Sequence, residues 1–545
     1  MKLDDVLARI GEFSPYQLWV YHWYCMLAFS VAFHHLGQVF LGGASDHWCA
    51  PPDTLTTNCT TLDECQLQNS SFSVPVDDED TARNEHNCMQ YVSYFNVTED
   101  APLEECTNGY EFDHSQYTNT IQEDFTLVCK HKRSAALAQS VYFFGLLVGS
   151  IFFGSVADRI GRKPTLIICA VLQSSLGLIT AFVQSFAAYV CLRFLIATAS
   201  MGIYLITFVF ATELVGLKWR NVAGNVVPIY WGLGIMLLAF LGYLVRDWRK
   251  LQIVLSVPTA VAVIYMPFLP ESVRWLLSQG EVAKAEAIIH RAARASKVTI
   301  PEHPFDEKLE EEKSDRKYTA LDLFRTPNLR KKTLNVMYNW FVVVMVYFGL
   351  SLSTADLGID PYVAFMLSGL VEIPARIFSI FAIDRFGRRP ILAFVILFGG
   401  ACCFLTVFIA PGVYRVTVAM SGKFALTAAF GVVYVYSAEL FPTPVRSAGM
   451  GLASMSGRLG SVISPLALVI SDIWEPLPLV LFSSLSVTAG LLGLLLPETI
   501  GTNLPETIEE GEAFGKKPRQ NKSNGDAHEL KVAADDDEVD EKLVV

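Results

Sequence analysis

Seven charged side chains lie within long apolar stretches of this sequence, and they are the groups best placed to do chemistry. They are Arg193, Glu213, Glu372, Arg376, Lys423, Glu439 and Arg458. Glu372 and Arg376 are four residues apart, so they can pair with each other on one helix. Lys423 and Arg458 have no carboxylate at helical spacing within their own stretches. A cation without an acidic partner can hold a carboxylate, which the planar guanidinium of arginine does with two hydrogen bonds.

The composition indicates a membrane protein and excludes several functional classes. The 545 residues are 52% hydrophobic and 18% charged, with a mean hydropathy of +0.37, whereas an average soluble protein is about 25% charged. The sequence contains no nucleotide-binding loop, metal-ligand cluster or nucleophile motif. We therefore expect no enzyme, no catalytic residue, no cofactor and no metal. The net charge of −12 does not indicate nucleic-acid binding.

Twelve apolar stretches are each long enough to cross a bilayer as a helix, which takes about 20 residues. No alternating strand pattern is present, and a helix satisfies its own backbone hydrogen bonds in lipid. The stretches are Leu18–Leu41, Ala135–Val156, Thr165–Phe186, Ala188–Leu214, Val222–Val245, Leu251–Leu269, Thr333–Leu352, Tyr362–Ile383, Ile391–Ala410, Val413–Ala438, Ala448–Ile473 and Leu477–Leu496. The sequence therefore predicts an all-α membrane protein with 12 transmembrane helices.

The basic residues predict which side each loop faces, because cytoplasmic loops carry an excess of Lys and Arg. Basic clusters follow the second and eighth stretches, and both termini are accordingly expected in the cytoplasm. The basic segment Arg246–Lys250 falls on the opposite side and is an exception. We divide the chain into an N-terminus at 1–16, a six-helix half at 17–270, a central cytoplasmic loop with a helix at 271–332, a second six-helix half at 333–500 and a tail at 501–545, disordered from about 511.

The loop between the first two stretches, about residues 43–133, is expected outside the cell. Residues 43–128 contain 17 acidic residues and one basic residue, Arg83. An even number of cysteines in such a loop indicates disulfides without fixing their pairing. The cysteines are Cys49, Cys59, Cys65, Cys88, Cys106 and Cys129, and Asn58, Asn69 and Asn96 are predicted glycosylation sites. Free thiols and chance sequons are the alternative reading.

Three motifs occur twice at the same separation, to within one residue. The pairs are Asp158–Pro164 with Asp384–Pro390, Thr212–Leu214 with Ala438–Leu440, and Pro270–Ser272 with Pro497–Thr499. Members of each pair lie six stretches apart, which predicts two six-helix halves in parallel repeat with a substrate held between them. This duplication favours a transporter over a receptor or a channel.

The repeated acidic and basic residues are predicted to form a gating latch that opens when the halves rock. An aspartate near a helix end can pair with an arginine of the same loop, and a basic loop that only sets the topology is the alternative. Glu213, Glu439 and Arg193 are interpreted as structural ion-pair partners. The latch residues are Asp158, Arg159, Arg162 and Glu213 in the first copy and Asp384, Arg385, Arg388 and Glu439 in the second.

These motifs resemble those of the major facilitator superfamily. Gly154–Pro164, Pro270–Trp275 and Pro497–Gly501 carry that resemblance, and the Cys-rich loop together with Ala438–Arg446 is similar to the solute carrier family of organic cation, carnitine and organic anion transporters. The resemblance extends from about Asp4 to Glu509. It implies the major facilitator fold and polyspecific transport of small organic ions across the plasma membrane by alternating access.

The resemblance also implies which charge the substrate carries. The position of Arg458 is acidic in the family's cation transporters and arginine in its anion and carnitine carriers, and the positions of Arg376 and Lys423 are basic in anion carriers. Glu372 matches an acidic position that the family uses near cations. Organic anions or carnitine-like zwitterions are therefore the expected substrates, since a cation beside Arg458 would be repelled.

Aromatic and polar residues complete the expected substrate site. By resemblance, Tyr230, Trp231, Tyr347, Phe348 and Phe430 line the cavity, where rings accept diverse apolar groups and quaternary ammonium; ordinary packing is the alternative. His35 and Gln38 are expected to face the same cavity. Proton coupling by His34 and His35 and plain helix–helix hydrogen bonding both remain open.

Two other functions compete with an anion or zwitterion carrier. An organic cation transporter of the same family is supported by Glu372 and the aromatic residues. A surface receptor or scaffold that does not transport is supported by the acidic, disulfide-bonded loop. The expected partners are a small organic ion and the lipid bilayer, and coupling to sodium, protons or a counter-anion is not decided by these residues.

Overall fold

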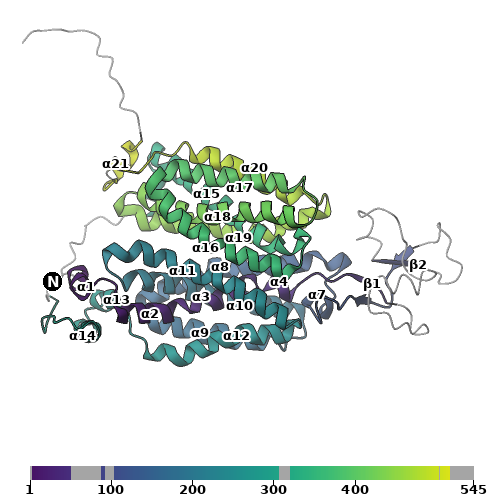
Figure 1. Ribbon diagram of the computed structural model, residues 1–545, viewed down its shortest axis with the longest axis horizontal. Helices are drawn as coiled ribbons and strands as arrows, with labels where there is room; N and C mark the ends of the chain where they lie inside the picture. The colour runs from purple at the N-terminus through teal and green to yellow at the C-terminus, as the bar shows by residue number, and fades with distance from the viewer. Residues whose placement is uncertain (1–2, 51–87, 92–102, 306–318, 503, 516–545) are drawn as a thin grey trace, which may run out of the picture.

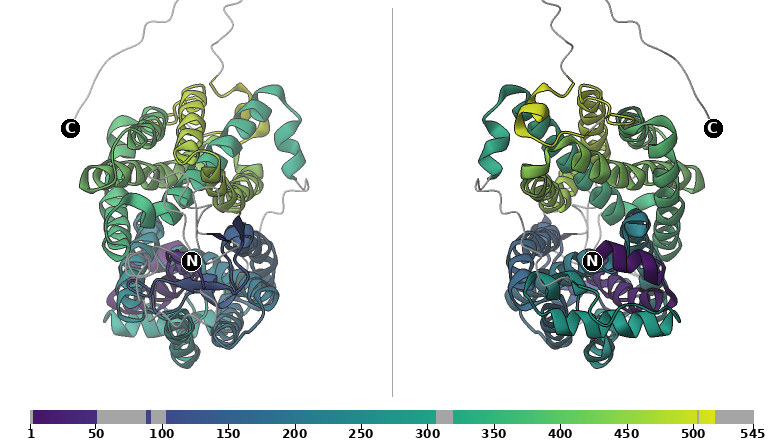
Figure 2. Two further views of the ribbon diagram at one scale, coloured as in Figure 1. Left: turned by 90° about the vertical axis from the view of Figure 1, so that its right-hand side faces the viewer. Right: turned by 90° about the vertical axis from the view of Figure 1, so that its left-hand side faces the viewer.

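The computed structural model describes residues 3–50, 88–91, 103–305, 319–502 and 504–515. Two helical bundles of consecutive sequence lie side by side (Figure 1), and the end-on views of Figure 2 show the same division. Within the described residues, 11 helical segments are long and apolar enough to cross a membrane, and one apolar helix is shorter. The predicted all-α architecture of twelve spans in two halves is confirmed.

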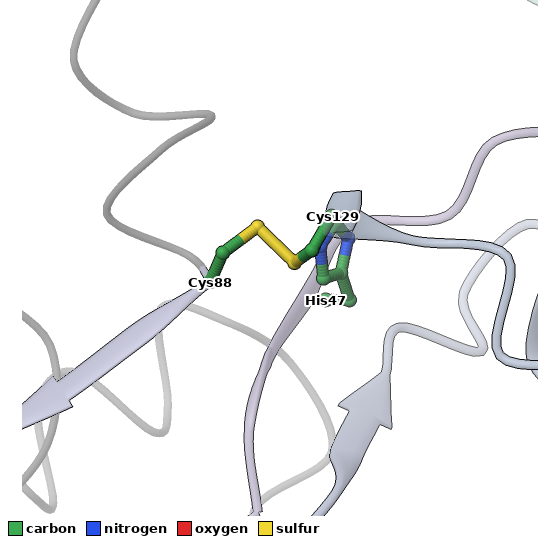
Figure 3. A group of neighbouring side chains, drawn as sticks. All are labelled: His47, Cys88 and Cys129. Atoms are coloured by element: carbon green, nitrogen blue, oxygen red, sulfur yellow. A yellow bond between two sulfur atoms is a disulfide. The ribbon is translucent and has the colours of Figure 1, made fainter. Parts of the chain in front are cut away.

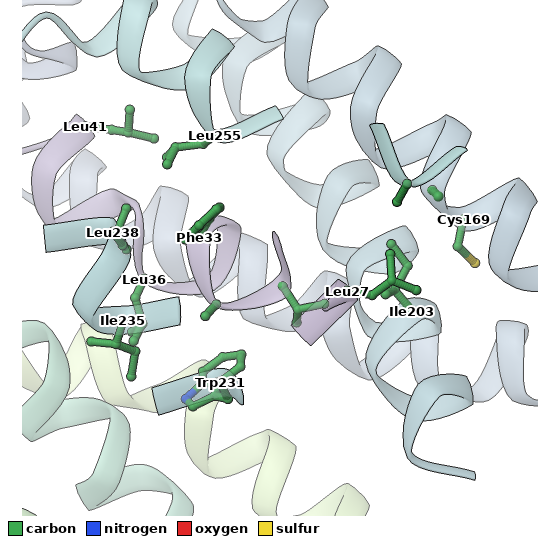
Figure 4. Packing of buried hydrophobic residues seen from close by; sticks show 14 of the residues in the cluster. Leu27, Phe33, Leu36, Leu41, Cys169, Ile203, Trp231, Ile235, Leu238 and Leu255 are labelled. Atoms are coloured by element: carbon green, nitrogen blue, oxygen red, sulfur yellow. The ribbon is translucent and has the colours of Figure 1, made fainter. Parts of the chain in front are cut away.

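The N-terminal half begins with a first span of three consecutive helical pieces. Phe33, at its centre, belongs with Leu255 and Trp231 to the large core cluster of this half (Figure 4). The helices are α2 (Pro15–Cys25), α3 (Leu27–Leu36) and α4 (Gln38–Leu41) in the first span, then α8 (Arg133–Ile160), α9 (Arg162–Thr180), α10 (Phe186–Glu213), α11 (Arg220–Leu244) and α12 (Trp248–Tyr265).

The C-terminal half repeats this arrangement around its own core cluster, which includes Trp340, Leu426 and Phe482. Its helices are α15 (Pro327–Leu352), α16 (Pro361–Phe386), α17 (Arg388–Thr406), α18 (Val413–Leu440), α19 (Arg446–Val469) and the shorter α20 (Leu477–Gly493). Large apolar side chains point outward from both bundles, with Phe182, Phe268 and Phe381 being 73%, 77% and 72% exposed. Such exposure suits a surface surrounded by lipid.

The two halves meet where α11 packs on α16 and where α8 packs on α19. Glycines allow the first of these contacts to be close. A Cβ at Gly369 would lie 2.9 Å from the carbonyl oxygen of Gly232, and a Cβ at Gly232 would lie 3.2 Å from the Cβ of Glu372. Small residues at such a crossing let two helix backbones approach within the membrane, which brings Glu372 up against the opposite half.

On the predicted outer side, one tyrosine of the C-terminal half packs among aromatic side chains of the N-terminal half. Tyr362 at the start of α16 stacks on Phe40 with ring centroids 5.3 Å apart, and Tyr243 lies edge-on at 5.7 Å. At the same end, Lys132 Nζ lies 3.2 Å from Asp472 Oδ1 and links α8 to the end of α19. The halves are therefore in contact at their outer ends.

The outer loop contains two short antiparallel pairs, β1 (His47–Cys49) with β4 (Tyr110–Phe112) and β2 (Met89–Tyr91) with β3 (Leu103–Glu105). Disulfides join Cys49 to Cys106 and Cys88 to Cys129. His47 lies beside the second bond (Figure 3), but disulfide sulfurs are not thiolates and so do not offer a metal site. Cys59, Cys65 and the sequons at Asn58, Asn69 and Asn96 lie outside the described residues.

The basic exception Arg246–Lys250 is explained by acidic residues near it. The helix α7 (Ile121–Asp124) of the outer loop brings Asp124 Oδ2 to 2.9 Å from Arg249 Nε and 2.8 Å from Trp248 Nε1. Asp247 caps α12 by accepting from the backbone of Arg249. Arg249 is thus paired with an aspartate of the acidic loop and Lys250 with the neighbouring Asp247.

Short helices dock on each half at the end predicted to be cytoplasmic. The apolar face of α1 (Leu3–Ile10) packs with α13 (Val273–Ser278) and α14 (Val282–Ala295), and Asp4 pairs with Arg220 and Arg274. On the C-terminal half, Glu512 of α21 (Ile508–Ala513) accepts from the backbone N–H of Asn328, the second residue of α15. The disorder expected from about residue 511 therefore does not apply to 511–515, and the rest of the tail lies outside the described residues.

Candidate functional site

A buried ion pair lies where the two halves meet. Lys423 Nζ on α18 is 3.6 Å from Glu372 Oε1 on α16, and the two side chains are 1% and 0% exposed. Lys423 also donates a hydrogen bond to the hydroxyl of Ser368. The lysine thus obtains its carboxylate from another helix, which sequence spacing could not reveal. Glu372 pairs with Lys423, and no such pair with Arg376 is present among the described residues.

Hydrogen bonds extend this pair across the boundary between the halves. The Tyr347 hydroxyl on α15 donates to Glu372 Oε1 and accepts a hydrogen bond from Trp231 Nε1 on α11 at 3.1 Å. The second carboxylate oxygen of Glu372 is buried and has no hydrogen-bond partner within the described residues. Trp231, Tyr347, Glu372 and Lys423 therefore form one connected polar chain between the halves.

Arg376, one turn after Glu372, is buried without an acidic partner. Its guanidinium lies over the ring of Phe430 at 5.3 Å from the centroid, and its Nε has no hydrogen-bond partner among the described residues. No carboxylate of the described chain lies within 4.0 Å of it. Aromatic contact stabilises the cation only partly, so the charge of Arg376 stays largely uncompensated.

Arg458 on α19 is the second cation of this half that lacks an acidic partner. Its guanidinium donates to Ser454 Oγ on the same helix at 2.7 Å. Throughout the residues that the structure covers, no carboxylate oxygen lies within 4.0 Å of it. Of the three cations expected in the site, Lys423 is thus neutralised by a carboxylate, whereas Arg376 and Arg458 keep their positive charge.

The predicted aromatic residues do not all converge. Tyr347 has its ring centroid 5.1 Å from that of Phe348 and 6.3 Å from that of Phe430. Trp231 joins them from the opposite half through its hydrogen bond to Tyr347. Tyr230, the next residue of α11, instead meets His22, with its hydroxyl 2.7 Å from His22 Nδ1. Its contacts are therefore made within the N-terminal half.

His35 reaches the central aromatic group, whereas Gln38 is occupied within its own half. The His35 ring lies edge-on to Trp231 at 5.1 Å, and its Nδ1 is 2.8 Å from the carbonyl oxygen of Val31. Gln38 is buried and accepts a hydrogen bond from the Tyr189 hydroxyl at 2.8 Å. The hydrogen bond of Gln38 therefore joins α4 to α10, whereas that of His35 to Val31 lies within α3.

Arg193 is not the ion-pair partner that we expected. It is 1% exposed and donates to the carbonyl oxygen of His34 at 3.1 Å and to Gln139 Oε1 at 3.2 Å. Its guanidinium lies 4.2 Å from the ring centroid of Tyr142. Neutral acceptors and a π-face therefore surround this arginine, with no carboxylate within 4.0 Å in the described part of the chain.

The first copy of the predicted latch joins three segments at one end of the N-terminal half. Arg162 lies 3.2 Å from Asp158 and 3.0 Å from Glu213, while Ser272 Oγ donates to Glu213 at 2.5 Å. Glu271 accepts from the backbone N–H of Lys163 at 3.0 Å. These residues belong to α8, α9, α10 and the segment after α12.

The second copy has the same geometry in the C-terminal half. Arg388 lies 3.9 Å from Asp384 and 3.0 Å from Glu439, and Thr499 Oγ1 donates to Glu439 at 2.5 Å. Glu498 accepts from the backbone N–H of Arg388 at 3.0 Å. The motif that recurs after the sixth and twelfth spans therefore supplies latch residues in both copies, a role that the sequence did not reveal.

Each latch closes within one half, and its opening when the halves rock stays a prediction. All partners of Arg162 lie in the N-terminal bundle and all partners of Arg388 lie in the C-terminal bundle. Arg159 and Arg385 are exposed and form no ion pair among the described residues. The latches therefore hold each bundle together as a rigid unit.

The two latch glutamates that cap helices differ in their proton affinity. Burial raises the pKa of Glu271, and its backbone hydrogen bonds and Arg162 offset this only partly. Burial acts in the same direction on Glu498, but N–H groups of Arg388, Ile500, Thr499 and Arg389 outweigh it and hold the pKa below its usual range. The C-terminal latch therefore binds its carboxylate in the charged form more strongly.

Comparison with known proteins places this arrangement in a family. The model of the family described as "Sugar (and other) transporter" matches residues 92–510. The Drosophila melanogaster "Organic cation transporter protein" is 38% identical over 95% of this chain and 96% of its own length. The human "Solute carrier family 22 member 13" is 38% identical over 95% and 94%, and the human "Organic cation/carnitine transporter 2" is 33% identical over 93% of each chain.

Among solved structures, the xylose transporter XylE from E. coli in a partially occluded inward-open conformation shares the fold. The TM-score is 0.58 at 15% sequence identity, with 90% of this chain and 100% of XylE covered. At that identity the likeness concerns the fold alone. From the family match, the relatives and the duplicated six-helix halves it follows that this chain is a membrane transporter of the major facilitator superfamily and belongs to its solute carrier 22 family of organic-ion transporters.

Proposed function

We propose that this carrier moves organic anions or carnitine-like zwitterions across the plasma membrane by alternating access, with both termini in the cytoplasm. The observation that carries the proposal is Arg458, whose guanidinium donates to Ser454 on its own helix and has no carboxylate within 4.0 Å among the described residues. Arg376 is uncompensated in the same way. Lys423 adds no net charge to this region, because Glu372 neutralises it.

A negatively charged substrate supplies the partner that Arg458 and Arg376 lack. Moving a carboxylate next to a half-buried guanidinium supplies the partner that the protein does not provide, and low surrounding dielectric strengthens the attraction. A cation placed there would be repelled by Arg458 and Arg376 together. Aromatic rings such as Phe430 and Trp231 supply the apolar contact that tolerates different organic bodies.

Organic cation transport is the second candidate, and one observation favours it. The buried Oε2 of Glu372 has no hydrogen-bond partner within the described residues, so a cation could compete with Lys423 for this carboxylate. The names of two relatives, "Organic cation transporter protein" and "Organic cation/carnitine transporter 2", point the same way. The two candidates differ in whether Arg458 helps or hinders binding.

An uptake assay distinguishes these two candidate functions. Cells that express the protein are given labelled succinate, carnitine or tetraethylammonium. We expect uptake of succinate or carnitine, and its loss in an Arg458→Asp variant. Arg294→Asp is the matched control, because this exposed arginine lies at the end of α14 outside the spans. Surface expression of each variant is measured in parallel. Tetraethylammonium uptake by the unaltered protein that Arg458→Asp leaves unchanged would contradict the proposal.

A further inference from the structure

Arg246, in the turn between α11 and α12, lies at the boundary between the two halves on the predicted outer side. Its guanidinium carbon is 5.4 Å from the ring centroid of Tyr243 in its own half and 5.9 Å from that of Tyr362 in the C-terminal half. Its Nη1 donates to the carbonyl oxygen of Ser115 in the outer loop at 3.3 Å. Arg246 therefore contacts both halves and the outer loop.

The partners of Arg246 differ from those of the other two basic residues in this turn. Arg249 and Lys250 each have a carboxylate, supplied by Asp124 and Asp247 respectively. No carboxylate oxygen lies within 4.0 Å of Arg246 in the part of the chain that the structure describes. Carbonyl oxygens and two rings surround its guanidinium instead. Such neutral contacts stabilise a cation only partly, so Arg246 keeps most of its positive charge.

Separation of the halves at this end exposes the guanidinium of Arg246. The ring of Tyr362 is bordered by Phe40 at 5.3 Å, Tyr243 at 5.7 Å and this guanidinium at 5.9 Å, and the Tyr362 hydroxyl donates to the carbonyl oxygen of Gln116 at 3.2 Å. Tyr362 belongs to α16 and moves with the C-terminal half, whereas its neighbours stay with the N-terminal half. The place that Tyr362 leaves is then lined by two rings and one guanidinium.

This combination of groups suits an organic anion. The planar guanidinium meets a carboxylate with two hydrogen bonds, and aromatic rings accept the apolar part of the molecule. The surrounding outer loop is strongly acidic, with 17 acidic residues and one basic residue in 43–128, and therefore repels an approaching anion. A positive group at the boundary between the halves offsets this repulsion locally.

We propose that Arg246 is a substrate-binding residue of the outer entrance, which holds the anionic group of an arriving substrate before that group reaches Arg458. This inference rests on the proposed function and deepens it, because it adds a second position at which negative charge is selected. Tyr362 and the substrate occupy the same place in turn, Tyr362 when the outer end is closed and the substrate when it is open.

The test is uptake of labelled succinate or carnitine, whichever the unaltered protein takes up, by the variant Arg246→Gln. We expect KM to rise roughly fivefold, as for the loss of one ion pair near the surface, and to rise less at high ionic strength, because salt screens exposed charges. Arg246→Lys is expected to recover most of the affinity. Inhibition by tetraethylammonium is expected not to weaken. Lys250→Gln is the matched control, since it removes the same charge four residues away.

Arg246→Cys gives a second measurement, in which two charges are compared on one folded protein. Cells that express this variant are treated from outside with a membrane-impermeant thiosulfonate reagent that carries either an ammonium or a sulfonate group. The ammonium adduct is expected to lower KM and the sulfonate adduct to raise it. The unaltered protein receives the same reagents, which controls for native thiols such as the exposed Cys191.

The outcomes distinguish this inference from the proposed function. An unchanged KM in Arg246→Gln, an equal rise in Lys250→Gln, or the same KM for both adducts of Arg246→Cys overturns the inference alone, provided that Arg458→Asp abolishes uptake. If Arg458→Asp leaves uptake intact, the proposed function itself is overturned.

Discussion

Lys423 Nζ lies 3.6 Å from Glu372 Oε1, and the two side chains that form this ion pair are almost completely buried between α16 and α18. The pair explains why three basic residues in the second half do not act alike. A lysine that is neutralised by the protein holds helices together and positions Tyr347. Arg376 and Arg458, which lack such a partner in the described chain, remain to attract a substrate.

Breaking this pair on one side is expected to destabilise the protein strongly. Lys423→Met leaves the buried Glu372 carboxylate uncompensated, which costs about 3–5 kcal/mol, and the double variant Lys423→Met with Glu372→Gln is expected to recover much of that loss. Lys250→Met is the control, because its exposed pair with Asp247 contributes about 1 kcal/mol or less. Thermal unfolding in detergent is measured for the unaltered protein, Lys423→Met, Glu372→Gln, the double variant and Lys250→Met, and additive effects of the two buried changes would refute the coupling.

Acid is expected to weaken the two latches unequally. A carboxyl group whose pKa is lowered by folding, as in Glu498, contributes stability above its unfolded pKa and loses it as pH falls through the folded pKa. Glu271, whose pKa is raised, contributes most below its unfolded pKa and less as pH rises through the folded value. At neutral pH, Glu498→Gln is therefore expected to lower Tm more than Glu271→Gln does.

Melting curves recorded from neutral into acid pH check this difference. The difference in Tm between Glu498→Gln and the unaltered protein should become smaller on acidification, because the unaltered carboxylate loses its charge as well. The corresponding difference for Glu271→Gln should become larger. Equal effects of the two substitutions at every pH would show that the two caps are energetically equivalent.

The outer contact between the halves is expected to open during transport. Lys132 and Asp472 come from different halves and lie 3.2 Å apart at the outer end, so cysteines at both positions should form a cross-link that stops uptake. Reductant should restore uptake. Each single-cysteine variant receives the same treatment, which controls for reduction of the disulfides Cys49–Cys106 and Cys88–Cys129. Full uptake by the cross-linked protein would mean that this end does not separate.

The sequence predicted the fold well because the spans, the repeated motifs and the acidic outer loop are each recorded in local residue patterns. The partners of individual side chains could be predicted less well. Lys423 obtains its carboxylate from a residue 51 positions earlier, a distance that helical spacing cannot connect. Arg193 was expected to form an ion pair because it lies near the end of its span, yet a carbonyl, an amide and a ring surround it.

The residues of the latch were also only partly predictable from the sequence. The repeat pointed to Arg162 and Arg388, and their acidic partners Glu213 and Glu439 recur with them at the same separation. It did not reveal the roles of Glu271 and Glu498, because their hydrogen bonds to the backbone of Lys163 and Arg388 depend on how the chain folds and not on residue spacing.

The most direct test of the central claim is the affinity of the purified protein for succinate or carnitine, whichever is transported, with and without the charge at position 458. Arg458→Gln keeps a side chain that can donate hydrogen bonds and removes the positive charge. We predict a rise in Kd of on the order of a hundredfold, as expected for the loss of a charge-assisted contact at a site shielded from water. A Kd that does not change would contradict the claim that Arg458 holds the substrate anion.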